Sequence, residues 1–268
     1  TDSVRKIKVN DDYRINIDAL KDAIENDLAA GLLPFCVIGN AGTVNTGAID
    51  PLEDMNDVCK KYHLWFHVDG AFGALAKLVP AYAGQLKAME MADSVAFDLH
   101  KWMYMPYEIA CVLIKDAGAH RKTFSITPSY LLQESRGLSG GPEPANNFGM
   151  ELSRCFKSLK VWMSLKEHGI KKYAAMIEQN IAQAFYFGHL VQQQKQLELM
   201  TPVTMNIVCY RYSPGHLTDD ELNAVNKEIL IQLQEQGIAS PSSTLLQGRF
   251  AIRVCIVNKR TKKIDLDL

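Results

Sequence analysis

The sequence lacks the features that mark several specialised classes of protein. Its 268 residues carry a formal net charge of only −1, so neither nucleic acid nor an anionic membrane is favoured as a partner. No apolar run approaches the roughly 20 residues of a membrane span, and the first residues do not read as a secretory signal peptide. Together with 47% hydrophobic and 22% charged residues, these absences indicate an ordinary globular protein.

Cysteine is present but forms no recognisable pattern. The six cysteines are scattered, most of them within apolar runs: Cys36, Cys59, Cys111, Cys155, Cys209 and Cys255. No Cys-x-x-Cys pair and no Cys/His cluster occurs, so we expect neither a metal site nor a disulfide framework. A reducing cytoplasm is the simplest location for such a chain.

Segments with helical spacing alternate with apolar runs through the first part of the chain. The spacing predicts helices over residues 18–30 and 51–62, with Asp18 and Asp50 as their N-caps and Pro51 at the first position of the second helix. Apolar runs predict strands over residues 33–39, 65–69, 94–97 and 108–115. This alternation indicates an α/β fold with a mostly parallel sheet covered by helices.

The pattern changes in the second part of the chain. Residues 135–147 are rich in Gly, Pro, Ser and Asn, which predicts a loop, and a long helix is expected over residues 151–167. Beyond it we expect a helix to about residue 194, a strand at 205–212, a helix at 218–236 and a strand at 250–257. We interpret residues 1–164 as part of a large domain and residues 165–268 as a small α+β domain.

A lysine follows directly after one predicted strand. In a mostly parallel sheet, ligands bind beyond the carboxyl ends of the strands, and the segment Asp98–Lys101 falls there. A primary amine at this place is suited to form an imine with an aldehyde cofactor. Taken alone, a lysine at a strand end is more often a solvated side chain, so both interpretations stay open.

An aspartate ends the preceding strand of the same predicted sheet. Asp69 is followed by the small residues Gly70, Ala71 and Gly73, which would let a flat ligand approach the backbone. A carboxylate there can pair with a protonated pyridine nitrogen and keep the ring an electron sink. A helix N-cap is an equally ordinary role for Asp69 alone, but the acid and Lys101 at neighbouring strand ends favour a pyridoxal-type cofactor.

These two motifs belong to a longer series that resembles a known family. The series comprises Ala30–Phe35, Gly42–Thr43, His67–Phe72, Ala92–Ser94, His100–Trp102, Phe156–Trp162 and Phe250–Arg253. Through it, nearly the whole chain resembles the group II pyridoxal-phosphate (PLP) dependent amino-acid decarboxylases, and the aromatic branch more than the glutamate branch. The resemblance implies an aspartate-aminotransferase type of fold, with a large PLP-binding domain, a small C-terminal α+β domain and a homodimer.

The resemblance also implies roles for individual residues. Lys101 would be the Schiff-base lysine, Asp69 the partner of the ring nitrogen, Ala71 a contact of one ring face, His100 a neighbour of the phosphate and Thr43 a neighbour of the ring oxygen. Asp98 is placed among the cofactor-binding residues, but many relatives carry asparagine there. A carboxylate beside a phosphate is unfavourable, which argues against a direct phosphate contact. Arg253 matches an arginine near the active site in relatives, although a structural ion pair is an equal expectation.

Two departures from the family pattern stand out. The upstream part, which in the family holds a histidine that stacks on PLP, a phosphate-cradling loop and a segment of the dimer, does not precede Thr1, so we expect a fragment of a longer protein. In the loop, Phe148 stands where the family usually carries a tyrosine that helps protonate the carbanion. In some relatives this change accompanies aldehyde formation, so we count Phe148 among the catalytic positions.

The leading hypothesis is therefore a PLP-dependent decarboxylase of an L-amino acid, with an aromatic substrate expected. One alternative keeps the fold and cofactor but breaks or forms a different bond, as in an aldehyde synthase or another carbon–carbon lyase. An alternative of another class is an inactive fragment or scaffold that only folds and dimerises. Neither a metal, a nucleic acid nor a membrane is expected as a partner.

Overall fold

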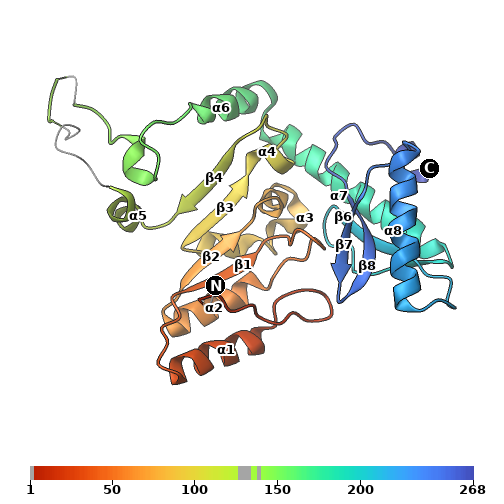
Figure 1. The fold of residues 1–268 in the computed structure, drawn as a ribbon. Helices are drawn as coiled ribbons and strands as arrows, with labels where there is room; N and C mark the ends of the chain where they lie inside the picture. Colours follow the sequence, from red (N-terminus) through yellow and green to blue (C-terminus); the bar gives the residue numbers. More distant parts are fainter. Residues whose placement is uncertain (1–2, 126–133, 138–139) are drawn as a thin grey trace.

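The computed structural model describes residues 3–125, 134–137 and 140–268 (Figure 1). Its first sheet has the strand order β1-β2-β3-β4, formed by Cys36–Asn40, Trp65–Asp69, Ser94–Asp98 and Ala110–Ile114. β1, β2 and β3 are parallel, whereas β4 runs antiparallel to β3. The expected mostly parallel sheet is therefore confirmed, with one antiparallel strand at its edge.

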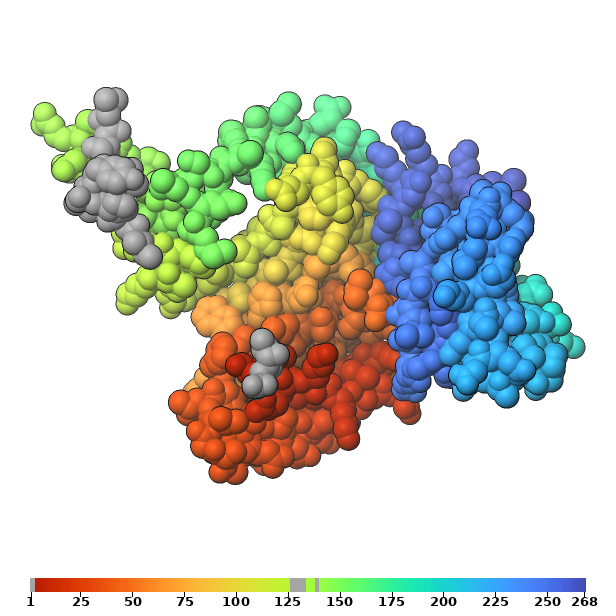
Figure 2. Space-filling model, viewed as in Figure 1, coloured from red at the N-terminus to blue at the C-terminus, as the bar shows by residue number. Residues whose placement is uncertain are grey.

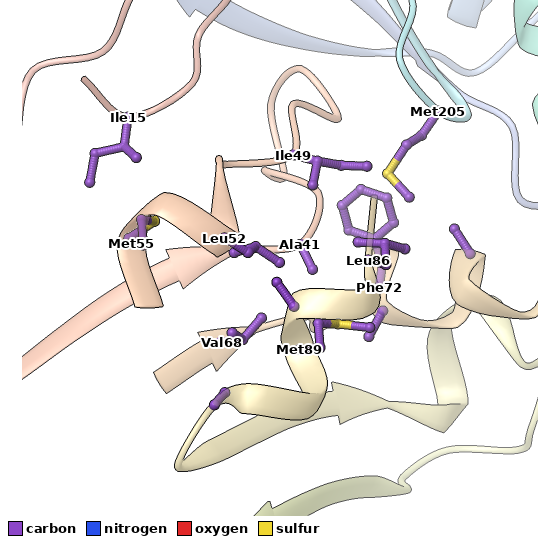
Figure 3. Packing of buried hydrophobic residues seen from close by; sticks show 14 of the residues in the cluster. Ile15, Ala41, Ile49, Leu52, Met55, Val68, Phe72, Leu86, Met89 and Met205 are labelled. Carbon is purple, nitrogen blue, oxygen red and sulfur yellow. The ribbon is translucent and has the colours of Figure 1, made fainter. Parts of the chain in front are cut away.

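Helices and short 3₁₀ turns precede, connect and follow the strands of this sheet. They are α1 (Ile17–Ala29), α2 (Leu52–Tyr62), η1 (Gly73–Leu78), α3 (Pro80–Ala83), η2 (Lys87–Met91), α4 (Leu99–Trp102) and α5 (Ala117–Phe124). α2 buries Leu52 and Met55 against the sheet (Figure 3). A Cβ at Gly39 of β1 would lie 2.9 Å from the Met55 sulfur, so glycine lets the helix approach the strand closely.

Both predicted N-caps are wrong. α1 is capped by Asn16, whose side chain accepts a hydrogen bond of 2.8 Å from the Ala19 amide, and Asp18 lies inside its first turn. The N-cap of α2 is Pro51, not Asp50. The Asp50 carboxylate is instead buried and accepts hydrogen bonds from the backbone amides of Ile15 and Asn40, both at 2.8 Å. A buried carboxylate needs hydrogen-bond donors, and Asp50 finds them outside α2. It therefore links the segment before α1 to β1.

A second, antiparallel sheet with the order β5-β6-β8-β7 occupies the C-terminal part. Its elements and their neighbours are η4 (Ala145–Phe148), α6 (Lys157–His168), α7 (Ile170–Gln193), β5 (Leu197–Leu199), β6 (Ile207–Tyr212), α8 (Asp219–Glu235), β7 (Ser242–Leu246), β8 (Arg249–Cys255) and α9 (Lys263–Asp267). α6 begins six residues later than expected. α8 matches its prediction, and Thr218 and Glu221 close a capping box at its start.

One hydrophobic cluster joins the two sheets. Met205 and Ile207, from the C-terminal part, are fully buried in the same cluster as Ala41, Val68 and Phe72, and Figure 3 shows Met205 beside the Phe72 ring. The expected division between residues 164 and 165 falls within α6 and stays a prediction. The shared core holds the loops after β1 and β2 against the second sheet.

The described ranges contain neither a membrane-spanning helix nor a cluster of metal-binding side chains. There, no helix combines the length and apolar character needed to cross a bilayer. Within the same ranges, no group of three or more His, Cys, Asp or Glu side chains is arranged to bind a metal ion. All six cysteines are free thiols.

Candidate cofactor site

Backbone hydrogen bonds tie together the three segments that carry most of the predicted site residues. Asn40, Asp69 and Ala96 lie in register across β1, β2 and β3. Beyond them, the amide of Ala41 donates to the Asp69 carbonyl and the amide of Asp98 donates to the Ala71 carbonyl, both at 2.8 Å. The chain ends that follow the three parallel strands therefore meet at one edge of the sheet.

Lys101 lies on α4, a single helical turn that directly follows β3. Its Nζ atom is 2.8 Å from Asp98 Oδ2, and 43% of the lysine side chain is exposed. The next residue, Trp102, is completely buried and its Nε1 donates to Asn180 Oδ1 of α7 at 3.1 Å. Trp102 thus fixes the turn in the core and leaves Lys101 at the sheet edge.

Asp69 is partly buried at the end of β2. Its Oδ1 accepts a hydrogen bond of 3.0 Å from the Ala71 amide, which orients the carboxylate over the turn that follows. His67 precedes it on the same face of the strand, and its Nδ1 lies 2.7 Å from Ser94 Oγ. Burial lowers the pKa of His67, while the Asp69 charge opposes that shift.

Glycines allow the loops at this edge to lie against each other. A Cβ at Gly73 would be 2.0 Å from the Ala41 carbonyl oxygen, and a Cβ at Gly70 would be 2.4 Å from Ala74 Cβ. Gly42 has a φ of +92°, a conformation that side chains other than glycine rarely adopt. The loop after β1 and the loop after β2 are therefore close-packed.

The side chains of His100 and Thr43 are held by local contacts. His100 Nδ1 is 2.8 Å from the Ile109 carbonyl oxygen and 3.1 Å from the Ile109 amide, and its ring stacks on Tyr107 at 4.4 Å. Thr43 Oγ1 lies 2.7 Å from Thr46 Oγ1 and accepts from the Ala48 amide at 3.2 Å. Both residues lie at the same sheet edge as Lys101.

Arg253 of β8 reaches from the second sheet to the loop that carries Thr43. Its Nε donates to the carbonyl oxygens of Val44 at 2.9 Å and Asn45 at 3.3 Å, and its Nη1 donates to Ser242 Oγ at 3.1 Å. All three acceptors are neutral. The hydrogen bonds from Arg253 Nε hold the loop that carries Thr43 against β8. The sequence alone gave no sign of this, because more than 200 residues separate the partners.

Phe148 lies elsewhere in the fold. Its ring contacts His120 of α5 at 5.4 Å between centroids, next to the ion pair of Arg121 with Glu143. α5 follows β4, whose last residue, Ile114, pairs with the first residue of β3. Figure 1 shows α5, whose His120 contacts Phe148, at the end of β4 that lies away from α4, the turn that carries Lys101.

Asn180 supports the turn that carries Lys101, and the sequence did not predict this role. Asn180 is fully buried on α7, where it also accepts from the Tyr104 hydroxyl at 2.5 Å. Its only sequence signal is a polar residue between the apolar positions Ile177 and Ile181.

A hollow of about 460 Å³ near the start of α2 is lined by residues such as Asp50 and Glu90, and no predicted site residue lines it.

The residues at this edge fit PLP by their chemistry. A primary amine can bind the aldehyde carbon, a carboxylate can pair with the ring nitrogen, and the imidazole of His100 and the hydroxyl of Thr43 can donate hydrogen bonds to oxygens. The donor set therefore suits a charged pyridine aldehyde.

Comparison with known proteins agrees with this chemistry. The family model described as the pyridoxal-dependent decarboxylase conserved domain matches residues 2–213. The chain is 37% identical over 260 residues to the aromatic-L-amino-acid decarboxylase of Bacillus atrophaeus. The aligned region covers 96% of this chain and 53% of that protein. The chain is 29% identical over 264 residues to the phenylacetaldehyde synthase of Petunia hybrida, covering 96% and 52%. The chain spans about half the length of these relatives.

The fold agrees as well. The crystal structure of Oryza sativa TDC with PLP and tryptamine matches with a TM-score of 0.92 and 26% identity, over 98% of this chain and 55% of that chain. The expected α/β architecture of PLP decarboxylases is thereby confirmed. With a family model that extends over most of the sequence and a relative that is 37% identical, this chain belongs to the pyridoxal-dependent decarboxylase family.

Proposed function

We propose that the protein containing this chain is a PLP-dependent decarboxylase of an L-amino acid, and that the amino acid is aromatic. The observation that carries the proposal is the hydrogen bond from Asp98 to Ala71, which brings the segments of Lys101 and Asp69 together at one sheet edge. The similarity to an aromatic-L-amino-acid decarboxylase supports the substrate class.

The residues of this chain would divide the work of holding PLP. When bound, PLP draws electrons away from the substrate's α-carbon, so that the carboxylate can leave as carbon dioxide. Lys101 would bind the aldehyde end and Asp69 would hold a proton on the ring nitrogen. At an effective dielectric constant of about 20, an ion pair at contact distance is worth about 4 kcal/mol. Asp69 would thus contribute about three decades in rate where that pairing is felt only in the transition state.

The other predicted residues would position the ring. Ala71 would contact one ring face, His100 would face the phosphate from its place against Ile109, and Thr43 would lie beside the ring oxygen. Asp98 would stand at the same edge without contacting the phosphate, since its carboxylate already faces Lys101 Nζ.

The test is release of amine and carbon dioxide by the full-length protein from a panel of L-amino acids, measured by mass spectrometry. We expect the aromatic amino acids to give stoichiometric amine and Lys101→Ala to abolish the reaction. The variant Lys77→Ala, which alters a lysine paired with Glu90 away from the site, should keep the activity. Amine from no member of the panel would refute the proposal, and the absence of both amine and aldehyde would favour a scaffold that only folds and dimerises.

An aldehyde synthase is the second candidate, favoured by Phe148 in the loop and by the similarity to the petunia phenylacetaldehyde synthase. Phenylalanine has no hydroxyl proton to deliver. The reaction would consume oxygen and water and give aldehyde, carbon dioxide, ammonia and hydrogen peroxide. Because Phe148 contacts α5, which lies away from the turn that carries Lys101 of its own chain, this role requires loop movement or a second subunit. Peroxide from the wild type, replaced by amine in Phe148→Tyr, would identify this activity.

We also infer a homodimer in a reducing cytoplasm, built on a large domain over residues 1–164 and a small domain over 165–268. Trp162 and Met163 of α6 are 58% and 56% exposed, and exposed apolar groups of this kind are typical of contact surfaces. An opening separates the segment before α6 from β4 (Figure 2), where Val112 and Leu113 are also exposed. Free thiols agree with a reducing compartment.

A further inference from the structure

Among the described residues, Asp98 forms a closer pair with its lysine than two other aspartates that stand three residues before a paired lysine. The pairs Lys21–Asp18 and Lys60–Asp57 have the same spacing of three residues, but their N–O distances are 3.4 and 3.7 Å and their aspartates are 89% and 70% exposed. Lys101 Nζ lies 2.8 Å from Asp98 Oδ2, and the Asp98 side chain is only 21% exposed. This pair therefore combines contact distance with a sheltered carboxylate.

The backbone fixes both members of the pair. Asp98 ends β3 and donates its amide to Ala71, while Trp102 is locked in the core directly after Lys101. A lysine free to choose its rotamer gains little from a surface acid, because the pairing costs side-chain entropy. Because Asp98 is already held in place, only the Lys101 side chain loses entropy when the pair forms.

Other charged groups lie around this pair. His100 Nε2 lies 4.0 Å from the same Asp98 oxygen. Glu108 faces His100 and pairs with Lys157, and Asp69 ends the neighbouring strand. Nearby carboxylates stabilise the charged form of an amine, whereas only the uncharged amine can attack an aldehyde.

We propose that Asp98 is the counter-ion of Lys101 in the cofactor-free protein: it holds the lysine side chain in an ion pair at the sheet edge and restrains its reactivity. This role rests on the proposed function for its purpose, but the pairing itself does not require the cofactor. Asp98 is thus a positioning residue that sets how readily Lys101 becomes a nucleophile.

The experiment is trace acetylation of the cofactor-free protein with acetic anhydride across a pH series, followed by peptide mass spectrometry of Lys101. Asp98→Asn keeps the shape of the side chain and removes its charge. We expect acetylation of Lys101 at about pH 8 to rise about two- to five-fold, the size expected when a partly exposed ion pair is removed. Asp57→Asn is the matched control, and it should change the acetylation of Lys60 less and that of Lys101 not at all.

An unchanged rate at Lys101 in Asp98→Asn would overturn the proposal, and a slower rate would show that Asp98 acts as a base. Should this variant not fold, the wild type decides: raising salt to about 1 M screens the pair and should speed acetylation of Lys101. No response to salt would also overturn the pairing. Because acetylation needs no PLP, failure to bind PLP would sink the proposed function while leaving this result intact.

Discussion

At the scale of single residues, the site depends on positions where no larger side chain fits. Gly73 begins η1 and lies against the backbone of Ala41, so that the loop after β1 rests on the loop after β2. Asp69 and Thr43 belong to these two loops. Their relative placement therefore depends on a glycine that contributes no chemistry of its own.

We expect Gly73→Ala to destabilise the protein by about 1–3 kcal/mol, because the new methyl group meets a backbone oxygen rather than a flexible side chain. The control is Gly84→Ala, since Gly84 has helical angles and nothing within 4 Å of an added Cβ. That change should be neutral or stabilise the fold by up to about 1 kcal/mol. Thermal unfolding of both variants measures the difference, and equal melting temperatures would contradict this account of Gly73.

At the scale of elements, the sequence predicts those whose signal is local. Apolar runs identify β1 to β4 and helical spacing identifies α2 and α8, because burial of one face determines them. β5 and β7 were missed because β5 has three residues and β7 begins with Ser-Ser-Thr. The capping error at α1 arose because Asn16 and Asp18 are both good N-caps, and neighbouring residues cannot decide between them.

The candidate site likewise contains residues with a local sequence signal and residues without one. Lys101 and Asp69 could be proposed from their places after apolar strands and from motif resemblance, although their roles remain predictions. The hydrogen bonds from Arg253 to the loop of Thr43 could not be predicted from the sequence, because their partners meet only through packing of the two sheets. Asn180, beneath Trp102, was hidden for the same reason.

We expect Arg253→Ala to loosen the loop over residues 42–47, because the two hydrogen bonds to the Val44 and Asn45 carbonyls are lost at about 1 kcal/mol each. Hydrogen exchange of the peptide containing Thr43 should become about ten-fold faster or more, and PLP should bind more weakly. Arg260→Ala, at an exposed arginine beyond β8, serves as the control. Exchange in Arg253→Ala that equals the wild type would show that the loop is held without these hydrogen bonds.

At the scale of the whole molecule, the described part of the chain exposes apolar surface on several sides. Phe35 and Ile38, beside and within the edge strand β1, are 76% and 58% exposed, and Trp162 of α6 is 58% exposed. An uncovered strand edge and apolar face favour association. The chain spans about half the length of its relatives, so the central test is made on the full-length protein.

The most direct test of the central claim is to add PLP to the full-length protein, reduce the mixture with borohydride and map the modified lysine by peptide mass spectrometry. The account predicts that the phosphopyridoxyl group is found on Lys101, that Lys101→Ala loses it, and that Asp69→Asn retains it while amine release falls by about three decades. A stable adduct on a different lysine, or none in the wild type, would contradict the assignment of Lys101.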